Sequence, residues 1–155
     1  MGFYSESNFD PERSIGYLMR RSMQLGTTAL DPVYAAAGIT KTQWSALVSI
    51  HFNSATTCAA IARDLSYDKG ATTRLVDQLE ERGWIVRSRA EGDRRLIRLA
   101  LTPAGEAIAA EVRTVVIARW NAWLKDWNDK DIMELTRLLQ RLRDDLQRDE
   151  GGASA

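Results

Sequence analysis

Residues 68–83, which read DKGATTRLVDQLEERG, contain both end signals and the buried positions of one helix. Asp68 can cap the N-terminus of a helix, and Gly83 is the residue type that most often follows a helix end. The apolar side chains between them share helical spacing and are Leu75, Val76 and Leu79. The first turn, in contrast, contains no large apolar side chain. The stretch therefore predicts a helix over residues 69–82 that is buried on one side and begins with a polar turn.

A shorter helix is predicted directly before this one, over residues 58–65, with Thr57 as its cap. Ser66 and Tyr67 between the two helices leave room for nothing but a tight turn. Two helices joined by a turn of about three or four residues form a helix-turn-helix unit, whose second helix enters a DNA groove. The DNA-contact candidates lie at the start of that second helix and are Lys69, Gly70, Thr72, Thr73 and Arg74.

The chemistry of these five residues suits DNA. Thr72 and Thr73 carry short hydroxyl groups and Arg74 a fork-shaped donor, both of which can read base edges in the major groove. Lys69 and the backbone amides near Gly70 can bind phosphate at the helix N-terminus. The alternative is that the threonines are merely tolerated near a helix start.

Two further helices are predicted before this unit. Thr40 and Gln43 form a capping box, which predicts a helix over residues 41–52. An earlier helix is expected to start at Asp10 and Pro11 and to reach residue 37. Pro32 is expected to kink or interrupt that earlier helix.

After Gly83 the pattern changes to short apolar and β-branched runs. Residues 84–89 and 96–101 predict two strands of a hairpin, with residues 90–93 between them. The loop of this hairpin is expected to carry Arg94 and Arg95.

Two long helices are predicted to follow the hairpin. Thr102 and Pro103 mark the start of a helix that runs to about residue 127, and Asn128 opens another. The last helix has apolar residues at steps of three and four, namely Ile132, Leu135, Leu139, Leu142 and Leu146. Such a heptad-like stripe on a terminal helix is typical of packing against a partner.

Several segments resemble the MarR family of bacterial transcriptional regulators. Residues 93–95 (DRR) and 101–105 (LTPAG) are similar to the wing signature that leads into the fifth helix of that family. Residues 73–85 resemble its recognition helix and first wing strand. Ala37-Gly38-Ile39-Thr40 with Gln43, Trp44 and Leu47 resembles the start of its second helix.

The resemblance implies a mainly α fold with a small β-hairpin wing. It implies a single MarR-like domain over residues 1–155, in which a winged helix-turn-helix lobe spans 40–102. Residues 11–37 and 103–149 would be dimerisation helices. Such a protein is expected to be a homodimer that binds double-stranded DNA at a pseudo-palindromic operator, as a repressor that a small, often aromatic, molecule releases.

The resemblance also implies roles for the wing residues. A guanidinium fits a narrow minor groove well, and Arg95 or Arg94 is expected to insert there. The family pattern favours Arg95 for the insertion and Asp93 for orienting its guanidinium. Asp93 could instead simply end the turn.

Aromatic residues indicate a candidate effector site. In this family the first, second and fifth helices surround a ligand cavity, and Trp44 and His51 are its candidate residues here. Trp120, Trp123 and Trp127 share helical spacing, which is more often typical of a core or a dimer interface.

Composition excludes several other classes. The 155 residues include 21 basic and 21 acidic side chains, so the net charge of zero argues against a protein that coats nucleic acid indiscriminately. The charge is distributed unevenly, because residues 82–98 contain six arginines against Glu91 and Asp93, a local charge of plus four. Directed binding at one face is therefore the expectation.

The remaining sequence features predict a cytoplasmic protein without catalytic machinery. One cysteine, Cys58, excludes an internal disulfide, and we expect neither a membrane span nor a signal peptide. No spacing typical of an enzyme, a metal site or a cofactor loop is visible, so none of these is expected. Two alternatives remain open: a redox-responsive regulator that uses Cys58, and a winged-helix protein-interaction module without an effector.

Overall fold

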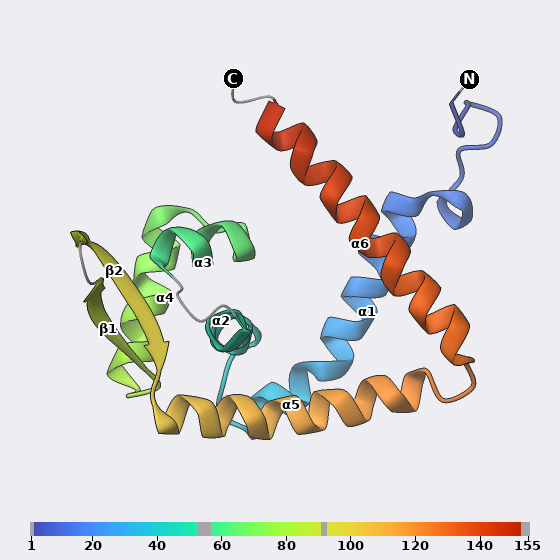
Figure 1. Cartoon of the computed structure of the whole chain (residues 1–155). Helices are drawn as coiled ribbons and strands as arrows, with labels where there is room; N and C mark the ends of the chain where they lie inside the picture. The colour runs from blue at the N-terminus through green and yellow to red at the C-terminus, as the bar shows by residue number, and fades with distance from the viewer. Residues whose placement is uncertain (1, 53–56, 91–92, 153–155) are drawn as a thin grey trace. The chain divides into compact units, whose positions relative to one another are not determined.

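The computed structural model describes residues 2–52, 57–90 and 93–152, apart from the side chains of residues 90, 93–95 and 150–152. It divides into two compact units, Met1–Val116 and Ile117–Ala155, and one helix runs from the first into the second. In chain order the elements are η1 (Pro11–Arg13), α1 (Ile15–Ala36), α2 (Lys41–Phe52), α3 (Cys58–Leu65), α4 (Lys69–Glu81), β1 (Ile85–Ala90), β2 (Asp93–Leu101), α5 (Pro103–Trp123) and α6 (Asp129–Gly152). Figure 1 shows this order along the chain.

Local capping explains where the middle helices begin. In the capping box of α2, the Thr40 N–H donates to Gln43 Oε1 at 3.0 Å, and the Gln43 N–H donates to Thr40 Oγ1 at 3.1 Å. Thr57 accepts from the Ala60 N–H at the start of α3. Asp68 caps α4 in the same way, so the sequence predicted all three helix starts correctly.

The N-terminal segment differs from the sequence prediction at two points. Asp10 makes no side-chain cap, and Pro11 opens a single 3₁₀ turn, while α1 begins after Ser14, whose hydroxyl accepts from the Tyr17 N–H. The second difference is that α1 continues through Pro32 to Ala36 without interruption. Leu30 and Tyr34 lie on either side of the proline and are both buried. Burial of these two side chains offsets the hydrogen bond that proline cannot make.

The hairpin is longer than the sequence predicted. β1 and β2 pair antiparallel from Ile85 opposite Leu101 to Ala90 opposite Asp93, with one irregularity at residues 89–90. Because β2 starts at Asp93, the backbone of Arg94 and Arg95 lies in a strand and not in the loop. The prediction of a loop position for these two arginines was therefore wrong, since pairing with β1 extends the strand.

The first unit has one hydrophobic core, to which each of its long helices and both strands contribute buried side chains. Buried side chains come from every helix from α1 to α5 and from both strands, and the largest fully buried ones are Leu47, Ile61, Leu79, Ile85, Val76, Val112 and Thr72. The hairpin lies beside α4 in Figure 1, and β1 contacts that helix. This packing holds the polar start of α4 and the hairpin on one common framework.

A tight junction connects the end of α4 to the start of α5. Thr102 Oγ1 donates to the Gly83 carbonyl at 2.6 Å and accepts from the Gly105 N–H at 3.0 Å. A Cβ atom on Gly105 would lie 1.9 Å from the Trp84 carbonyl oxygen, so this close approach requires glycine. The wing and α5 are thereby locked to each other at their common end.

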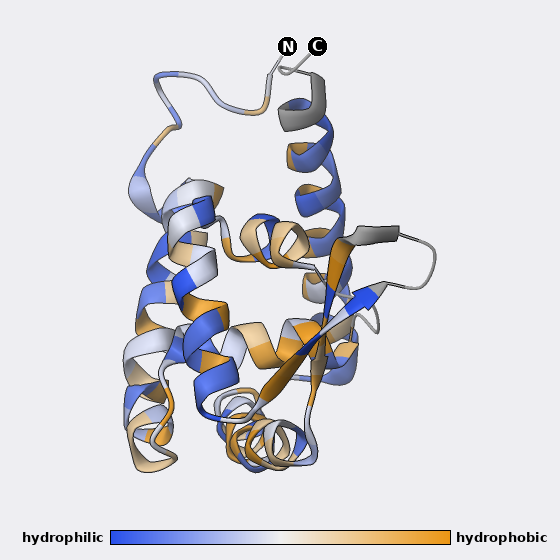
Figure 2. Ribbon diagram, turned by 90° about the vertical axis from the view of Figure 1, so that its left-hand side faces the viewer, coloured by the Kyte–Doolittle hydropathy of each residue, from blue (hydrophilic) through white to orange (hydrophobic). Residues whose placement is uncertain are grey.

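The second unit contains the end of α5 and the whole of α6. The sequence predicted an α5 that reached residue 127, but it ends at Trp123 and a turn follows. Asn128 then caps α6 by accepting from the Asp131 N–H at 2.9 Å. Figure 2 colours α6, the helix that leads to the C-terminus, as largely hydrophilic with apolar patches. None of the described helices is long and apolar enough to cross a membrane.

Candidate nucleic-acid interface

The start of α4 presents a polar, cationic surface. Lys69, Gly70, Thr73 and Arg74 are all exposed, as the sequence analysis expected. The Thr73 hydroxyl donates to the Lys69 carbonyl at 2.8 Å, which leaves its oxygen lone pairs free to accept from a base or a water. Four of the five predicted contact residues of α4 therefore share one accessible surface.

Thr72 is the exception and belongs to the core. Its relative exposure is 1%, and its hydroxyl donates to the Asp68 carbonyl at 2.9 Å. A buried hydroxyl cannot reach a base edge, so the assignment of Thr72 to the DNA surface is corrected. Its spacing contained the signal, because Thr72 precedes Leu75 and Val76 by three and four residues, on the buried side of α4.

Arg74 lies back across the first turn of α4. A Cβ atom added to Gly70 would be 3.2 Å from Asp68 Oδ1 and 3.6 Å from Arg74 Nη1. Asp68 accepts hydrogen bonds from the Ala71 and Gly70 amides and lies near the Arg74 charge, which together lower its pKa despite partial desolvation. The helix start is thus a compact arrangement of one carboxylate, one guanidinium and two backbone amides that donate to the carboxylate.

The predicted wing residues Asp93, Arg94 and Arg95 are the first three residues of strand β2. Their backbone is placed, whereas their side chains lie outside the described residues. The structure therefore assigns these three residues to one end of the hairpin, next to residue 90 of the partner strand.

Two other arginines of the basic segment make contacts with other residues of the protein, which the sequence did not predict. Arg87 of β1 contacts Asp77 Oδ1 at 2.5 Å and Glu80 Oε2 at 3.2 Å, both on α4. The pKa of Arg87 is raised, first by the hydrogen bond to Asp77. Arg82 donates to the Gly38 carbonyl at 2.8 Å, and its guanidinium lies 4.7 Å from the centre of the Trp84 ring. The spacing of two acids three residues apart on α4 was the available signal for the Arg87 contacts.

Comparison with known proteins identifies this architecture. The model of the MarR family matches residues 39–97, which include α2, α3, α4, β1 and the first half of β2. The Multiple antibiotic resistance protein MarR of Salmonella typhimurium is 34% identical over 97 residues, which are 63% of this chain and 67% of that protein. The chain belongs to the MarR family.

Solved structures of MarR-family proteins agree with the fold. The apo form of wild-type MarR from E. coli is 27% identical, covers 83% of this chain and 96% of its own, and has a TM-score of 0.71. NadR in complex with 4-hydroxyphenylacetate is 24% identical, covers 90% of this chain and 97% of its own, and has a TM-score of 0.79. The chain is thus a MarR-family transcriptional regulator with a winged-helix DNA-binding fold.

The two effector-site candidates of this MarR-family chain lie on α2 in different environments. Trp44 is half-buried and packs with Tyr34, at a ring-centre distance of 5.7 Å. Its indole Nε1 is buried without a hydrogen-bond partner among the described residues. His51 Nδ1 lies 2.8 Å from Glu106 Oε2, which ties α2 to the start of α5.

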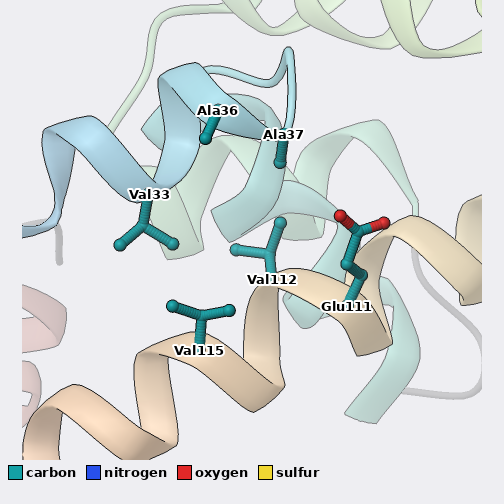
Figure 3. Close-up of a pocket in the computed structure, with 6 residues that line it drawn as sticks. All are labelled: Val33, Ala36, Ala37, Glu111, Val112 and Val115. Atoms are coloured by element: carbon teal, nitrogen blue, oxygen red, sulfur yellow. The ribbon is translucent and has the colours of Figure 1, made fainter.

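A small pocket lies elsewhere, between the end of α1 and α5. Figure 3 shows its lining, which consists of Val33, Ala36, Ala37, Glu111, Val112 and Val115. Its volume of about 130 Å³ is below the roughly 300–1,000 Å³ of ordinary ligand pockets. Trp44 and His51 do not line it. An effector site at these two residues therefore remains a proposal of its own.

Proposed function

We propose that this MarR-family regulator is a homodimeric repressor that acts in the cytoplasm and binds double-stranded DNA at a pseudo-palindromic operator. The observation that carries the proposal is the exposed start of α4, where Lys69, Gly70, Thr73 and Arg74 form one polar surface beside the hairpin. These polar side chains do not contribute to the hydrophobic core, whereas base edges in the major groove can accept hydrogen bonds from them.

Within the major groove, Arg74 and Thr73 would read the base edges. An arginine guanidinium can form a bidentate hydrogen bond with guanine, and this contact discriminates strongly between bases. Lys69 would bind a phosphate, which fixes the register of the helix on the duplex. Gly70 keeps this surface free of a side chain, so the backbone itself can approach the DNA.

At the wing, Arg95 would enter the minor groove while Arg94 contacts the backbone and Asp93 orients a guanidinium. The support is positional, since all three residues lie at one end of β2. Each arginine that reaches the DNA would displace condensed cations, so binding would weaken steeply as salt rises.

The dimer would be built from helices outside the DNA-binding part. α6 contains no buried residue among those described, yet it carries five exposed large apolar side chains: Met133, Leu135, Leu138, Leu139 and Leu146. On α5, Trp120 and Trp123 are also exposed and pack edge to face on each other. An apolar surface of this kind is typical of an interface. A second copy would bury it and hold two α4 helices about one turn of DNA, roughly 34 Å, apart.

A small aromatic effector would bind near Trp44 and His51. The buried, unpartnered indole N–H of Trp44 supports this site, because an unsatisfied donor costs free energy that a ligand oxygen would recover. NadR, a structural neighbour, is in complex with 4-hydroxyphenylacetate. A ligand that prefers a state with a different α4 spacing would lower operator affinity by linkage.

The function is tested by fluorescence anisotropy with the DNA upstream of the protein's own gene and with a scrambled duplex of equal length. We expect tighter binding to the upstream DNA, with a strong dependence on salt. Equal and weak binding to both duplexes would instead favour a protein-interaction module.

The effector site is tested separately by titrating aromatic carboxylic acids into the wild type and Trp44→Phe, with thermal shift and operator release as readouts. Phenylalanine keeps most of the ring packing against Tyr34 and removes the N–H donor. A ligand that stabilises both proteins equally would not use that donor, which would contradict the placement of the site at Trp44.

A further inference from the structure

We propose that Arg87, Asp77 and Glu80 form a joint that fixes the wing to the recognition helix α4, so that the DNA contact of Arg95 depends on this joint. Arg87 is then a positioning residue that acts through the wing and does not touch DNA itself. The inference rests on the proposed function, because it assumes that Arg95 contacts the operator.

The geometry of the joint is that of one fork between two carboxylates. Arg87 Nη2 lies 2.5 Å from Asp77 Oδ1, and Nη1 lies 3.2 Å from Glu80 Oε2. Asp77 and Glu80 are three residues apart and therefore neighbours on one side of α4. The Arg87 side chain is 29% exposed, so the ion pairs are partly shielded from water. A planar guanidinium can hold two partners at once in fixed directions, which an ammonium cannot.

Arg87 lies near the end of the hairpin that is opposite to residues 93–95, so its contacts with α4 can set the orientation of the whole hairpin. Arg87 pairs with Leu99 in the half of the ladder that is anchored in the core, whereas residues 93–95 lie at the other end of the same two strands. A two-stranded ribbon has little stability of its own and twists readily. A contact from β1 to α4 therefore sets the direction in which the far end points.

The joint also defines which arginines of the basic segment can serve DNA. Arg87 forms ion pairs with two acids of α4, so its charge neutralises carboxylates that would otherwise repel phosphate. Any test must separate this charge effect from the positioning effect. The double substitution Asp77→Asn with Arg87→Gln does so, because it removes one negative and one positive charge and leaves the local net charge unchanged.

The decisive experiment is a double-mutant cycle on operator affinity, measured by anisotropy at fixed salt. Arg95→Ala is introduced into the wild type and into the Asp77→Asn/Arg87→Gln protein. In the wild type we expect a loss of about tenfold or more, as for an arginine that contacts DNA directly. In the charge-balanced protein without the joint, we expect Arg95→Ala to cost less than about threefold.

The matched control is Arg98→Gln, which removes one charge from an exposed position of the same hairpin. Its effect and that of Arg95→Ala are expected to multiply without coupling. Should the Asp77→Asn/Arg87→Gln protein fail to fold, Arg87→Lys replaces it, because lysine keeps the charge and loses the fork.

The outcomes separate the positioning role of Arg87 from the DNA contact of Arg95. Equal loss from Arg95→Ala with and without the joint overturns the positioning role of Arg87 and leaves the DNA-binding proposal standing. No loss from Arg95→Ala in the wild type overturns both the wing assignment and the joint. A merely structural role for Arg87 would lower the free energy of unfolding and leave the Arg95 factor unchanged.

Discussion

Thr72 and Thr73 are identical neighbours on α4 with opposite environments. Thr72 is enclosed by the core and Thr73 faces outward, so the same chemical change at the two positions separates folding from DNA binding. Thr72→Val removes a buried hydroxyl bonded to Asp68 and is expected to lower the free energy of unfolding by about 1 kcal/mol. Its operator affinity, corrected for the folded fraction, should match that of the wild type.

Thr73→Val is the matched change, with the reverse expectation. Its stability should stay within roughly 0.5 kcal/mol of the wild type, while its operator affinity falls by about tenfold. Urea denaturation and anisotropy on the same two proteins provide the comparison. A larger affinity loss for Thr72→Val than for Thr73→Val would contradict the assignment of the α4 surface.

Gly105 is the position with the least room for a side chain. Because a Cβ there would meet the Trp84 backbone, Gly105→Ala is expected to destabilise the fold by roughly 1–3 kcal/mol or more. Gly16 is the control, since it lies in α1 with nothing within 4 Å of an added Cβ. Gly16→Ala should stabilise by roughly 0.5–1 kcal/mol in chemical denaturation. Equal effects at the two glycines would refute the close contact at the α4–α5 junction.

Asp68 makes a prediction about acid stability. Its pKa is lowered in the folded state, chiefly by the hydrogen bond from the Ala71 amide, so its ionised form stabilises the fold above the ordinary aspartate pKa of 3.8. That contribution is lost as the pH falls through the lowered pKa. Asp68→Asn keeps a cap without the charge, so its stability difference from the wild type should shrink between pH 7 and about pH 3. A difference that is independent of pH would contradict this role.

At the scale of elements, the sequence predicted those boundaries that local hydrogen bonds determine. The starts of α2, α3 and α4 depend on Thr40, Thr57 and Asp68, each of which bonds a backbone amide three residues away. Spacing alone therefore located them. The continuity of α1 through Pro32 could not be read in this way, because distant core partners of Leu30 and Tyr34 hold it.

The hairpin shows the same division. Its existence followed from two apolar runs, but the start of β2 at Asp93 depends on pairing with β1, which no local pattern specifies. The contacts of Arg87 with α4 are likewise non-local. Of the candidate site, the polar start of α4 was predicted from the sequence, whereas the burial of Thr72 and the contacts of Arg82 and Arg87 with other residues required the fold.

For the whole molecule, the proposed operator binding requires two copies of the chain. Leu139→Glu places a charge within the apolar stripe of α6 and is expected to yield monomers in sedimentation at micromolar concentration. Because two linked contacts bind far more tightly than one, operator affinity should fall by about a hundredfold or more. Gln140→Glu adds the same charge to the adjacent position outside the stripe. A Leu139→Glu protein that remains dimeric, like Gln140→Glu, would argue against α6 as the interface.

The net charge of zero conceals an uneven distribution of charge along the chain. The excess positive charge of residues 82–98 is balanced elsewhere in the chain. A neutral protein with such a basic segment is expected to bind DNA through that segment and with strong dependence on salt, rather than to coat it.

The reading of the operator by α4 is tested by the affinity of the wild type and Arg74→Ala for the upstream duplex and for a scrambled duplex, measured by anisotropy over a series of salt concentrations. We expect the wild type to prefer the upstream duplex by about a thousandfold or more, and log affinity to fall linearly with log salt. Arg74→Ala should lose most of that preference while it retains weak, salt-dependent binding to both duplexes. A wild type that binds both duplexes alike, or an Arg74→Ala protein that keeps the full preference, would contradict the proposal that α4 reads the operator.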